Sequence, residues 1–328
     1  MPSMLEKTLW HPVALADAVG DQPQAVQLLG QALVLWRGPA GQVLAWKDRC
    51  PHRGARLSLG RVAEGRLECP YHGWQFDAQA RCQRVPALPE FEPPASHCAT
   101  AFDTTLAHGL VWVRLAKPEG APLPVPAWEA GGLRTVDCGP YDVATSAPRV
   151  VENFLDMAHF SFVHEDWLGS RSHTRIDDYA VQETAAGVRA TGCKAWQPRS
   201  NLHSVAPAQV EYVYEVTGPF SAVLTKVPEA GSTAVEGWRE SIGLFVCPVA
   251  HEQSRVWFRL AVADFHTPDE ALRAFQHTIF TQDQPVLESQ TPKRLPLDLR
   301  AELHTTADRL SSAYRRHLAR LGITFGVD

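Results

Sequence analysis

Two short stretches of the sequence each pair one cysteine with one histidine. The first contains Cys50 and His52 as Cys-x-His, and the second contains Cys69 and His72 as Cys-x-x-His, with sixteen residues between them. Thiolate and imidazole are good metal donors, and four of them in two close pairs provide what a metal centre needs. The two stretches together therefore predict a metal site, although any one of these residues alone would more simply be a buried thiol or a core histidine.

The same four donors would suit zinc, so the spacing of the ligands must distinguish a zinc site from an iron-sulfur cluster. Zinc sites more often repeat Cys-x-x-Cys or end in two histidines several residues apart. One cysteine and one histidine from each of two loops instead suit a [2Fe-2S] cluster, with two thiolates on one iron and two imidazoles on the other. Because neutral histidine ligands raise the reduction potential of such a cluster, the site is predicted to be an electron-transfer centre.

The double motif resembles that of Rieske iron-sulfur proteins. Within this group, the proteins of respiratory and photosynthetic complexes carry an additional cysteine in each loop, and the two are joined as a disulfide. Here Arg53-Gly54-Ala55 follow His52, and Pro70-Tyr71 follow Cys69, so neither loop has the additional cysteine. The resemblance is therefore to the ferredoxin and oxygenase type, and it implies that both Cys–His pairs bind the cluster.

A second stretch with metal-binding residues has the spacing Asn-x-x-Asp-x-x-His-x-x-x-x-His, formed by Asn153, Asp156, His159 and His164. At about 100° per residue, positions three apart share one helix face. The first three residues would line up on a helix, but His164 would not. The helix must therefore distort or end nearby if both imidazoles are to reach one metal. The alternative is an amphipathic helix with solvated Asp and His side chains.

This stretch resembles the mononuclear iron motif of Rieske non-haem iron oxygenases, in which two histidines and a distant carboxylate leave positions open for oxygen. The resemblance implies that His159 and His164 bind iron. Asp156 matches the acid that hydrogen-bonds a ligand histidine on one side and a cluster histidine of the neighbouring subunit on the other. A carboxylate in that place also orients the imidazole and raises its basicity. We therefore expect Asp156 and Asn153 to be catalytic residues.

The third iron ligand is expected on a helix that begins at Pro268 and runs towards Glu288, because proline is favoured at the first helical position. The segment 280–290 resembles the family segment that carries the carboxylate ligand. Asp283 is therefore the predicted ligand, and Glu288 is the competing candidate.

Short apolar runs separated by turn residues fill the first part of the chain, residues 8–116, as expected for short strands. A proline-rich stretch follows and predicts an extended connector. We therefore expect a Rieske [2Fe-2S] domain over residues 1–117, a connector over residues 118–127 and a catalytic mononuclear iron domain over residues 128–328.

The second domain is expected to combine strands and helices. Four apolar runs between residues 205 and 262 predict antiparallel strands, since residues 210–216 alternate between apolar and polar side chains. The Arg-rich stretch 299–318 predicts a closing amphipathic helix. The fold class is therefore α+β, with an all-β N-terminal domain followed by a curved antiparallel sheet with helices, of the helix-grip type.

The composition of the chain indicates which partners and which cellular compartment to expect. The 328 residues carry a net charge of −5 without a basic tract, so neither nucleic acid nor an anionic membrane is an expected partner. Charged residues near the start argue against a signal peptide, and no uncharged run is long enough to span a bilayer. Five of the seven cysteines lack pair spacing, which is typical of buried thiols in a reducing compartment. We expect a cytoplasmic protein.

A one-electron cluster and an iron with open positions imply a division of labour, and the family resemblance gives it a reaction. It implies a terminal oxygenase that uses O2 and electrons to hydroxylate or oxidatively demethylate a small aromatic or heterocyclic substrate. The sequence has no Gly-x-Gly-x-x-Gly fingerprint, so electrons from NAD(P)H are expected through a partner reductase, with or without a ferredoxin.

Two other functions and one assembly complete the expectations. The first alternative is a ring cis-dihydroxylating dioxygenase, and the second is a non-enzymatic Rieske electron carrier with a ligand-binding domain. The family resemblance also implies a homotrimer, in which a head-to-tail contact brings one subunit's cluster beside the next subunit's iron.

Overall fold

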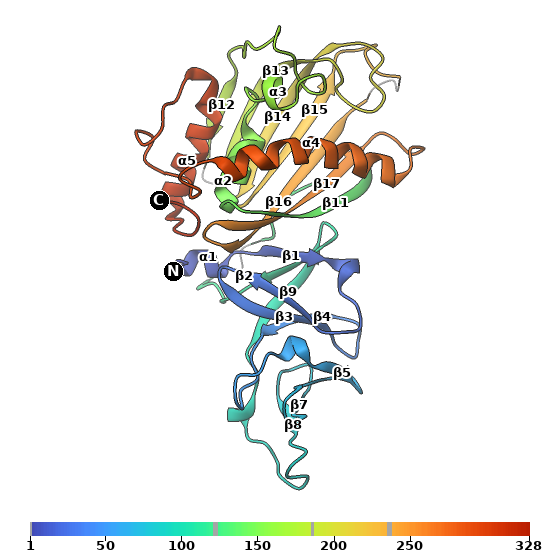
Figure 1. Ribbon diagram of the computed structural model, residues 1–328, viewed down its shortest axis with the longest axis vertical. Coiled ribbons are helices and arrows are strands. Elements are labelled where there is room, and N and C mark those ends of the chain that lie inside the picture. Colours follow the sequence, from blue (N-terminus) through green and yellow to red (C-terminus); the bar gives the residue numbers. More distant parts are fainter. Residues whose placement is uncertain (1, 121–123, 185–186, 235–237) are drawn as a thin grey trace. The chain divides into compact units, whose positions relative to one another are not determined.

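The computed structural model describes residues 2–120, 124–184, 187–234 and 238–328. The chain forms two compact units, Pro2–Val125 and Pro126–Asp328 (Figure 1). The boundary between the units falls inside the proline-rich stretch 118–127, of which residues 121–123 lie outside the described residues. The expected domain limits at residues 117 and 128 stay predictions.

The N-terminal unit is built almost entirely from antiparallel strands, as its short apolar runs predicted. A six-stranded sheet has the order β1-β10-β9-β4-β3-β2, and a smaller sheet has the order β5-β6-β7-β8. The strands are β1 His11–Leu15, β2 Gln24–Leu28, β3 Gln31–Arg37, β4 Val43–Lys47, β5 Arg61–Ala63, β6 Arg66–Glu68, β7 Gln75–Phe76, β8 Cys82–Arg84, β9 Ala101–Ala107 and β10 Leu110–Arg114. One short helix, α1 Met4–Thr8, precedes them.

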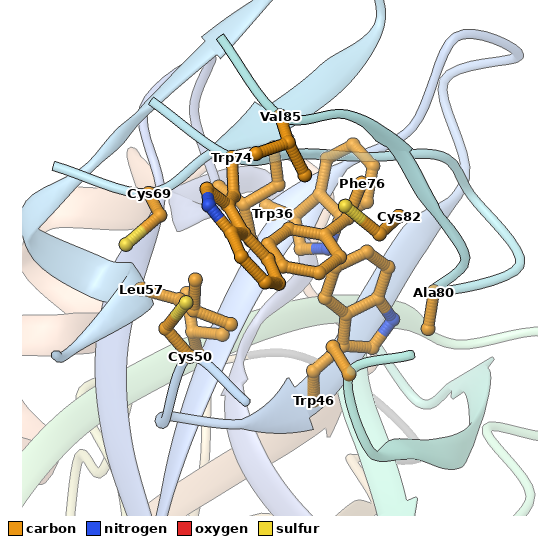
Figure 2. Packing of buried hydrophobic residues seen from close by; sticks show 13 residues of the cluster. Trp36, Trp46, Cys50, Leu57, Cys69, Trp74, Phe76, Ala80, Cys82 and Val85 are labelled. Carbon is orange, nitrogen blue, oxygen red and sulfur yellow. The ribbon is translucent and has the colours of Figure 1, made fainter. Parts of the chain in front are cut away.

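Aromatic side chains form the core beside the two Cys–His stretches (Figure 2). The rings of Trp36 and Trp46 meet edge to face at 4.9 Å, and Trp46 meets Phe76 in the same way at 6.3 Å. Cys50 and Cys69 belong to the same buried cluster. Because the core is packed, it fixes where both cysteine loops begin.

The C-terminal unit contains one seven-stranded antiparallel sheet with the order β11-β17-β16-β15-β14-β13-β12. Its strands are β11 Arg134–Val143, β12 Ala180–Glu183, β13 Val188–Gln197, β14 Ala208–Gly218, β15 Ser221–Pro228, β16 Glu240–Ala250 and β17 Gln253–Val262. The four predicted strands correspond to β14–β17. The sequence did not indicate β11 and β13, because register shifts at Gly139-Pro140 and at Gly192 interrupt their apolar–polar alternation.

Helices cover this sheet and each other. They are α2 Ala147–Leu155, α3 Phe160–Val163, α4 Asp269–Ser289 and α5 Arg309–Leu321. α4 packs on β11, α2 packs on strands β15–β17 and on both α4 and α5, and α5 packs on β12 and β13 (Figure 1). Within the described ranges, no helix is long and apolar enough to cross a membrane.

Two predicted helix limits need correction. α4 begins one residue later than predicted, since Pro268 is its N-cap. The closing helix was predicted over residues 299–318, but it begins only at Arg309, after a capping box between Thr305 and Asp308 supplies hydrogen bonds that favour a helix start there. One of its arginines, Arg315, is also buried, with 2% of its surface exposed, rather than solvated.

Candidate metal centres

The two loops that carry the Cys–His pairs have the same backbone hydrogen bonds. Gly54 N–H donates to Cys50 O over 2.9 Å, and Gly73 N–H donates to Cys69 O over 3.1 Å. In each loop the cysteine N–H also donates to the carbonyl five residues later, over 2.8 Å. Both glycines lie in the left-handed region, with φ of +75° and +69°, where an L side chain would be strained. The two loops are therefore alike in build as well as in sequence.

The cysteine side of this centre is buried. Cys50 and Cys69 are 1% and 2% exposed, and Figure 2 shows their sulfurs turned toward the same space beside Trp74. Burial raises the pKa of the Cys50 thiol to about 12, and the neighbouring Cys69 contributes in the same direction. A thiol with such a pKa stays protonated at neutral pH, so its use as a ligand requires a cation that displaces the proton.

The histidine side faces outward. His52 and His72 are exposed, and their ring centroids lie 4.7 Å apart. His52 stacks on Trp74 at 4.6 Å with an interplanar angle of 4°, and Trp74 also stacks with His97 at 5.3 Å. The centre thus has a buried thiol side and an exposed imidazole side.

This separation bears on the choice between zinc and a cluster. In the described part of the chain, the one group of three or more Cys, His, Asp or Glu donors within 4.8 Å of one another lies elsewhere, in the C-terminal unit. The two sulfurs and the two imidazoles therefore do not converge on one point, as a single tetrahedral zinc would require. Two separate pairs fit the two irons of a [2Fe-2S] cluster.

The predicted alignment of Asn153, Asp156 and His159 on one helix face is wrong, because α2 ends at Leu155. Asp156 has an extended backbone, and its carboxylate accepts hydrogen bonds from the backbone N–H groups of Ala158 over 2.9 Å and His159 over 3.2 Å. An Asp side chain that binds nearby backbone N–H groups competes with the helix. The sequence reasoning had allowed for a helix end nearby, and Asp156 is where it occurs.

A single short helix then separates the two histidines. His159 lies at the N-cap of α3 and His164 at its C-cap. The His164 N–H donates to Phe160 O over 3.2 Å, and the backbone of His164 leaves the helical region. The change of direction brings the two imidazoles together, with 3.2 Å between their Nε2 atoms.

Asp283 of α4 completes the group from a distant part of the sequence. Its Oδ1 lies 3.4 Å from Nε2 of His159 and 3.2 Å from Nε2 of His164. The carboxylate is 7% exposed, and Oδ1 has no hydrogen-bond partner. Three of the predicted iron ligands therefore meet within a few ångströms.

The outer nitrogen of each imidazole is occupied. Nδ1 of His159 lies 2.9 Å from Asp156 Oδ2, and Nδ1 of His164 lies 2.8 Å from Gln282 Oε1. Both partners are acceptors, so each Nδ1 carries a proton and each imidazole can present an Nε2 lone pair to a metal at the centre. Two lone pairs and a carboxylate oxygen that face one another need a cation between them, and this donor set suits a divalent iron.

The titration of the second centre follows from the same contacts. Burial would lower the pKa of His159, but its hydrogen bond to Asp156 and the charge of Asp283 together raise it. Burial would raise the pKa of Asp156, but its hydrogen bonds with His159 and the backbone lower it. Without a metal, the site therefore stabilises a positive charge on the imidazole, which is the charge that a metal ion would supply.

The structure separates the two candidate carboxylates on α4. Glu288 Oε1 accepts hydrogen bonds from Ala144 N–H over 3.1 Å and from Gln284 Nε2 over 2.9 Å, so it is engaged away from the histidines. Gln282 is a site residue that the sequence reasoning missed. Its only signal was its position beside Asp283, and a helix neighbour is normally turned about 100° away.

A mostly apolar cavity is lined by the three predicted ligands. Concave, mostly apolar sites with a few polar groups are typical of small-molecule binding. Asn153 lines it, and apolar side chains of the helices and the sheet make up most of the wall, among them Val150, Phe154, Phe160, Leu244, Phe258 and Ile279. Among the aromatic residues of the sheet strands and their loops, Tyr212 lines the cavity, whereas Phe220, Trp238 and Trp257 are buried without lining it.

Both units match known protein families. Residues 9–102 match the Rieske [2Fe-2S] domain, and residues 143–322 match the vanillate O-demethylase oxygenase C-terminal domain. Each match spans the ligands assigned to its unit.

Characterised relatives cover most of the chain. It is 40% identical over 222 residues to a probable methylxanthine N7-demethylase of Pseudomonas sp. (strain TJI-51), covering 67% of this chain and 77% of the relative. It is 31% identical to the methylxanthine N1-demethylase NdmA of Pseudomonas putida, covering 95% and 88%. A structure of Pseudomonas putida CBB5 NdmA with caffeine superimposes with a TM-score of 0.82 at 30% identity, over 97% of this chain and 91% of that one.

Proposed function

The chain belongs to the Rieske oxygenase family, and from that premise we propose that it demethylates a small N-methylated heteroaromatic compound by monooxygenation. As a terminal oxygenase it takes electrons from redox partners and acts on a small molecule and O2. One observation carries the proposal. Three donors, His159, His164 and Asp283, converge at the edge of a mostly apolar cavity.

The proposal assigns the family's two cofactors to named residues. Cys50, His52, Cys69 and His72 would hold the [2Fe-2S] cluster, and His159, His164 and Asp283 would hold the mononuclear iron. When bound, the cluster supplies single electrons and the iron activates dioxygen next to the substrate. Asp156 would hold the His159 ring in place through Nδ1, and Gln282 would do the same for His164.

The overall reaction balances as a monooxygenation. An N-methyl group, O2, two electrons and two protons give an N-hydroxymethyl group and water. The N-hydroxymethyl product then releases formaldehyde and leaves an N–H. The apolar wall keeps bulk water from the reacting methyl group. Asn153 lines the cavity on the side of α2, where it can hydrogen-bond a polar substrate edge.

We also propose a head-to-tail homotrimer and a cytoplasmic location. The trimer is supported by the exposure of His52 and His72, which leaves the imidazole side of the cluster open to a neighbouring subunit. It is also supported by Asp156, whose side chain is 27% exposed next to His159. The cytoplasmic location is supported by the seven cysteines, none of which forms a disulfide.

Iron counting and labelled oxygen test the proposed function. The anaerobically purified protein should contain about three irons per chain and give a Rieske-type EPR signal after reduction, and His159→Ala/His164→Ala should retain about two. With a reductase and 18O2, demethylation of an N-methylated substrate such as caffeine should place one labelled atom in the released formaldehyde, trapped as it forms, and the other in water. Two labels in a ring diol would indicate a dioxygenase. Two irons from the start, unchanged in the double variant and by added Fe(II), would leave an electron carrier.

A further inference from the structure

A buried ion pair includes one residue of the cavity wall, Lys226. Lys226 on β15 and Glu240 on β16 are cross-strand neighbours, and the ammonium Nζ lies 2.9 Å from Glu240 Oε2. Their side chains are 5% and 7% exposed, and Lys226 lines the cavity. Lys226 Nζ also donates to Ser200 O over 2.8 Å. An ammonium has three N–H donors, so one remains after these two bonds.

Another polar residue of the cavity lining, Tyr212, lies next to Lys226, and together they form the polar end of the cavity. Tyr212 of β14 is the opposite cross-strand neighbour of Lys226, and its hydroxyl lies 2.6 Å from Gln197 Nε2. Gln197 is fully buried, and its Oε1 has no hydrogen-bond partner. The Tyr212 ring packs against Phe160 at 5.9 Å, and Phe160 packs against His164 at 6.0 Å. Aromatic rings thus connect this polar end of the cavity to the metal-ligand end.

The charge balance of the polar end favours one kind of ligand. Among the described residues that line the cavity, Lys226 is the only Lys or Arg, and Glu240 already neutralises it. A substrate carboxylate or sulfonate placed here would bring a second anion beside Glu240 and lose its hydration without a free cation in return. A neutral carbonyl oxygen needs only a donor, which Lys226 can provide.

We propose that the Lys226–Glu240 pair makes the cavity select neutral, carbonyl-bearing heteroaromatic substrates and reject aromatic acids. Lys226 donates its remaining N–H to the substrate carbonyl, and Glu240 cancels the charge that would attract an anion. The proposal rests on the proposed function, because it takes this cavity as the substrate site. It narrows the substrate class and gives Lys226 and Glu240 a role in specificity.

Removal of the Glu240 charge tests whether the ion pair selects neutral substrates over aromatic acids. Binding of caffeine, which is neutral and carries carbonyls, and of vanillate, an aromatic carboxylate, is measured by calorimetry on the iron-loaded protein under anaerobic conditions. The wild type should bind caffeine more tightly. Glu240→Gln leaves Lys226 uncompensated and should shift the affinity ratio toward vanillate by about 10- to 100-fold, the value of a charge-assisted hydrogen bond.

A matched control removes a carboxylate from another cross-strand ion pair of the same sheet. Glu215 of β14 pairs with Arg189 of β13 and does not line the cavity. Glu215→Gln should leave the affinity ratio unchanged. A wild type that prefers vanillate, a wild type that binds no neutral carbonyl-bearing N-methyl heterocycle, or a Glu240→Gln ratio within threefold of wild type would each overturn the proposal.

A second variant covers the case in which Glu240→Gln does not fold, since an unpaired buried charge is destabilising. Lys226→Met/Glu240→Leu replaces the whole pair by apolar side chains, which is commonly tolerated. It should weaken caffeine binding about 10-fold but leave the binding of N-methylindole, which lacks a carbonyl, unchanged. Equal losses for both ligands would overturn the proposal.

The iron count separates this inference from the proposed function. A protein with three irons that demethylates N-methylindole and caffeine equally well would support the proposed function. It would contradict the proposed substrate selection by Lys226 and Glu240. A protein without the third iron would sink the proposed function, whatever its binding preferences.

Discussion

The proposed cluster ligands lie between residues 50 and 72 on two loops with the same hydrogen bonds, whereas the proposed ligands of the second centre extend from His159 to Asp283. In the first centre, the ligand residues and the glycines that shape each loop are neighbours in sequence. In the second, the ligands come from both ends of α3 and from the middle of α4. A local centre can be recognised from its own segment, but a dispersed centre depends on how the whole unit packs.

The contacts that hold the proposed ligands in place are likewise local in the first centre and dispersed in the second. The cluster loops are closed by backbone hydrogen bonds within each loop. The iron site depends on side chains that hold other side chains, because Asp156 holds His159 and Gln282 holds His164. Substitutions of the proposed cluster ligands should therefore affect the cluster directly. Iron binding should also change when residues that do not contact the metal are substituted.

The largest expected effect comes from a cluster ligand. Cys69→Ser should abolish the visible absorption of the cluster and lower turnover below ~1% of wild type, because the metal-thiolate bonds hold the cluster and no electron reaches the iron without it. Visible spectra, iron counts and product analysis give the result. Cys82→Ser is the matched control, since Cys82 is a buried thiol of the same core whose Sγ contacts Arg84 O. An intact cluster in Cys69→Ser would contradict the assignment.

The next effect separates electron delivery from metal binding. Asp156→Asn should retain both metals but slow product formation by about 10- to 100-fold, because the neutral amide holds the His159 imidazole less strongly and no longer carries a charge. Iron counts and single-turnover rates of the reduced protein measure it. Glu165→Gln is a control at a nearby carboxylate that pairs with Arg171 on the surface. Wild-type single-turnover rates in Asp156→Asn would remove Asp156 from the electron path.

A smaller effect tests indirect support within the iron site. Gln282→Leu removes the acceptor for His164 Nδ1 and should weaken Fe(II) binding about 10-fold while the cluster stays intact. Iron titration of the metal-depleted site, followed by EPR of the cluster, measures both. Gln284→Leu on the same helix is the control, since Gln284 bonds Asp142 O and Glu288 instead. Equal Fe(II) affinity in Gln282→Leu and wild type would show that His164 is oriented without it.

The sequence predicted these two regions unequally, for physical reasons. The all-β N-terminal unit and strands β14–β17 followed from apolar runs and alternation, because those patterns are local. Strands β11 and β13 were not predicted, because bulges interrupt their alternation of apolar and polar side chains. The spacing required a helix to distort or end near the histidines, but it did not place the end at Leu155, since that depends on the Asp156 carboxylate binding backbone N–H groups rather than solvent.

The residues that line the cavity could not be predicted from the sequence, for a related reason. Which strand residues face inward depends on register, and a shift of one residue would exchange the two faces. Lys226 and Glu240 are therefore ordinary strand charges in the sequence, and only the pairing of β15 with β16 brings them together as an ion pair at the cavity. The position of Gln282 likewise required the packing of α4 against the histidines.

The smallest expected effect concerns the buried network that attaches the iron segment to the end of the chain. Glu302 bonds Arg149 of α2 and Arg315 of α5 over 2.6 Å and 2.5 Å. Burial would raise the pKa of Glu302, but these two arginines lower it from 4.5 to about 2. The folded state thus binds fewer protons than the unfolded state between these values. The carboxylate should therefore stabilise the fold above about pH 4.5, and this contribution should be lost as the pH falls toward 2.

Glu302→Gln should accordingly lower the free energy of unfolding at pH 7 by about 1–2 kcal/mol, a value reduced for the partial exposure of the carboxylate. The difference from wild type should shrink between pH 4.5 and pH 3, as measured by urea denaturation. Glu183→Gln, at an exposed cluster with Arg316 and Arg320, is the control and should change stability less. A pH-independent difference for Glu302→Gln would mean that the network stabilises α2 by packing rather than by charge, and the second centre would then depend on distant residues for shape alone.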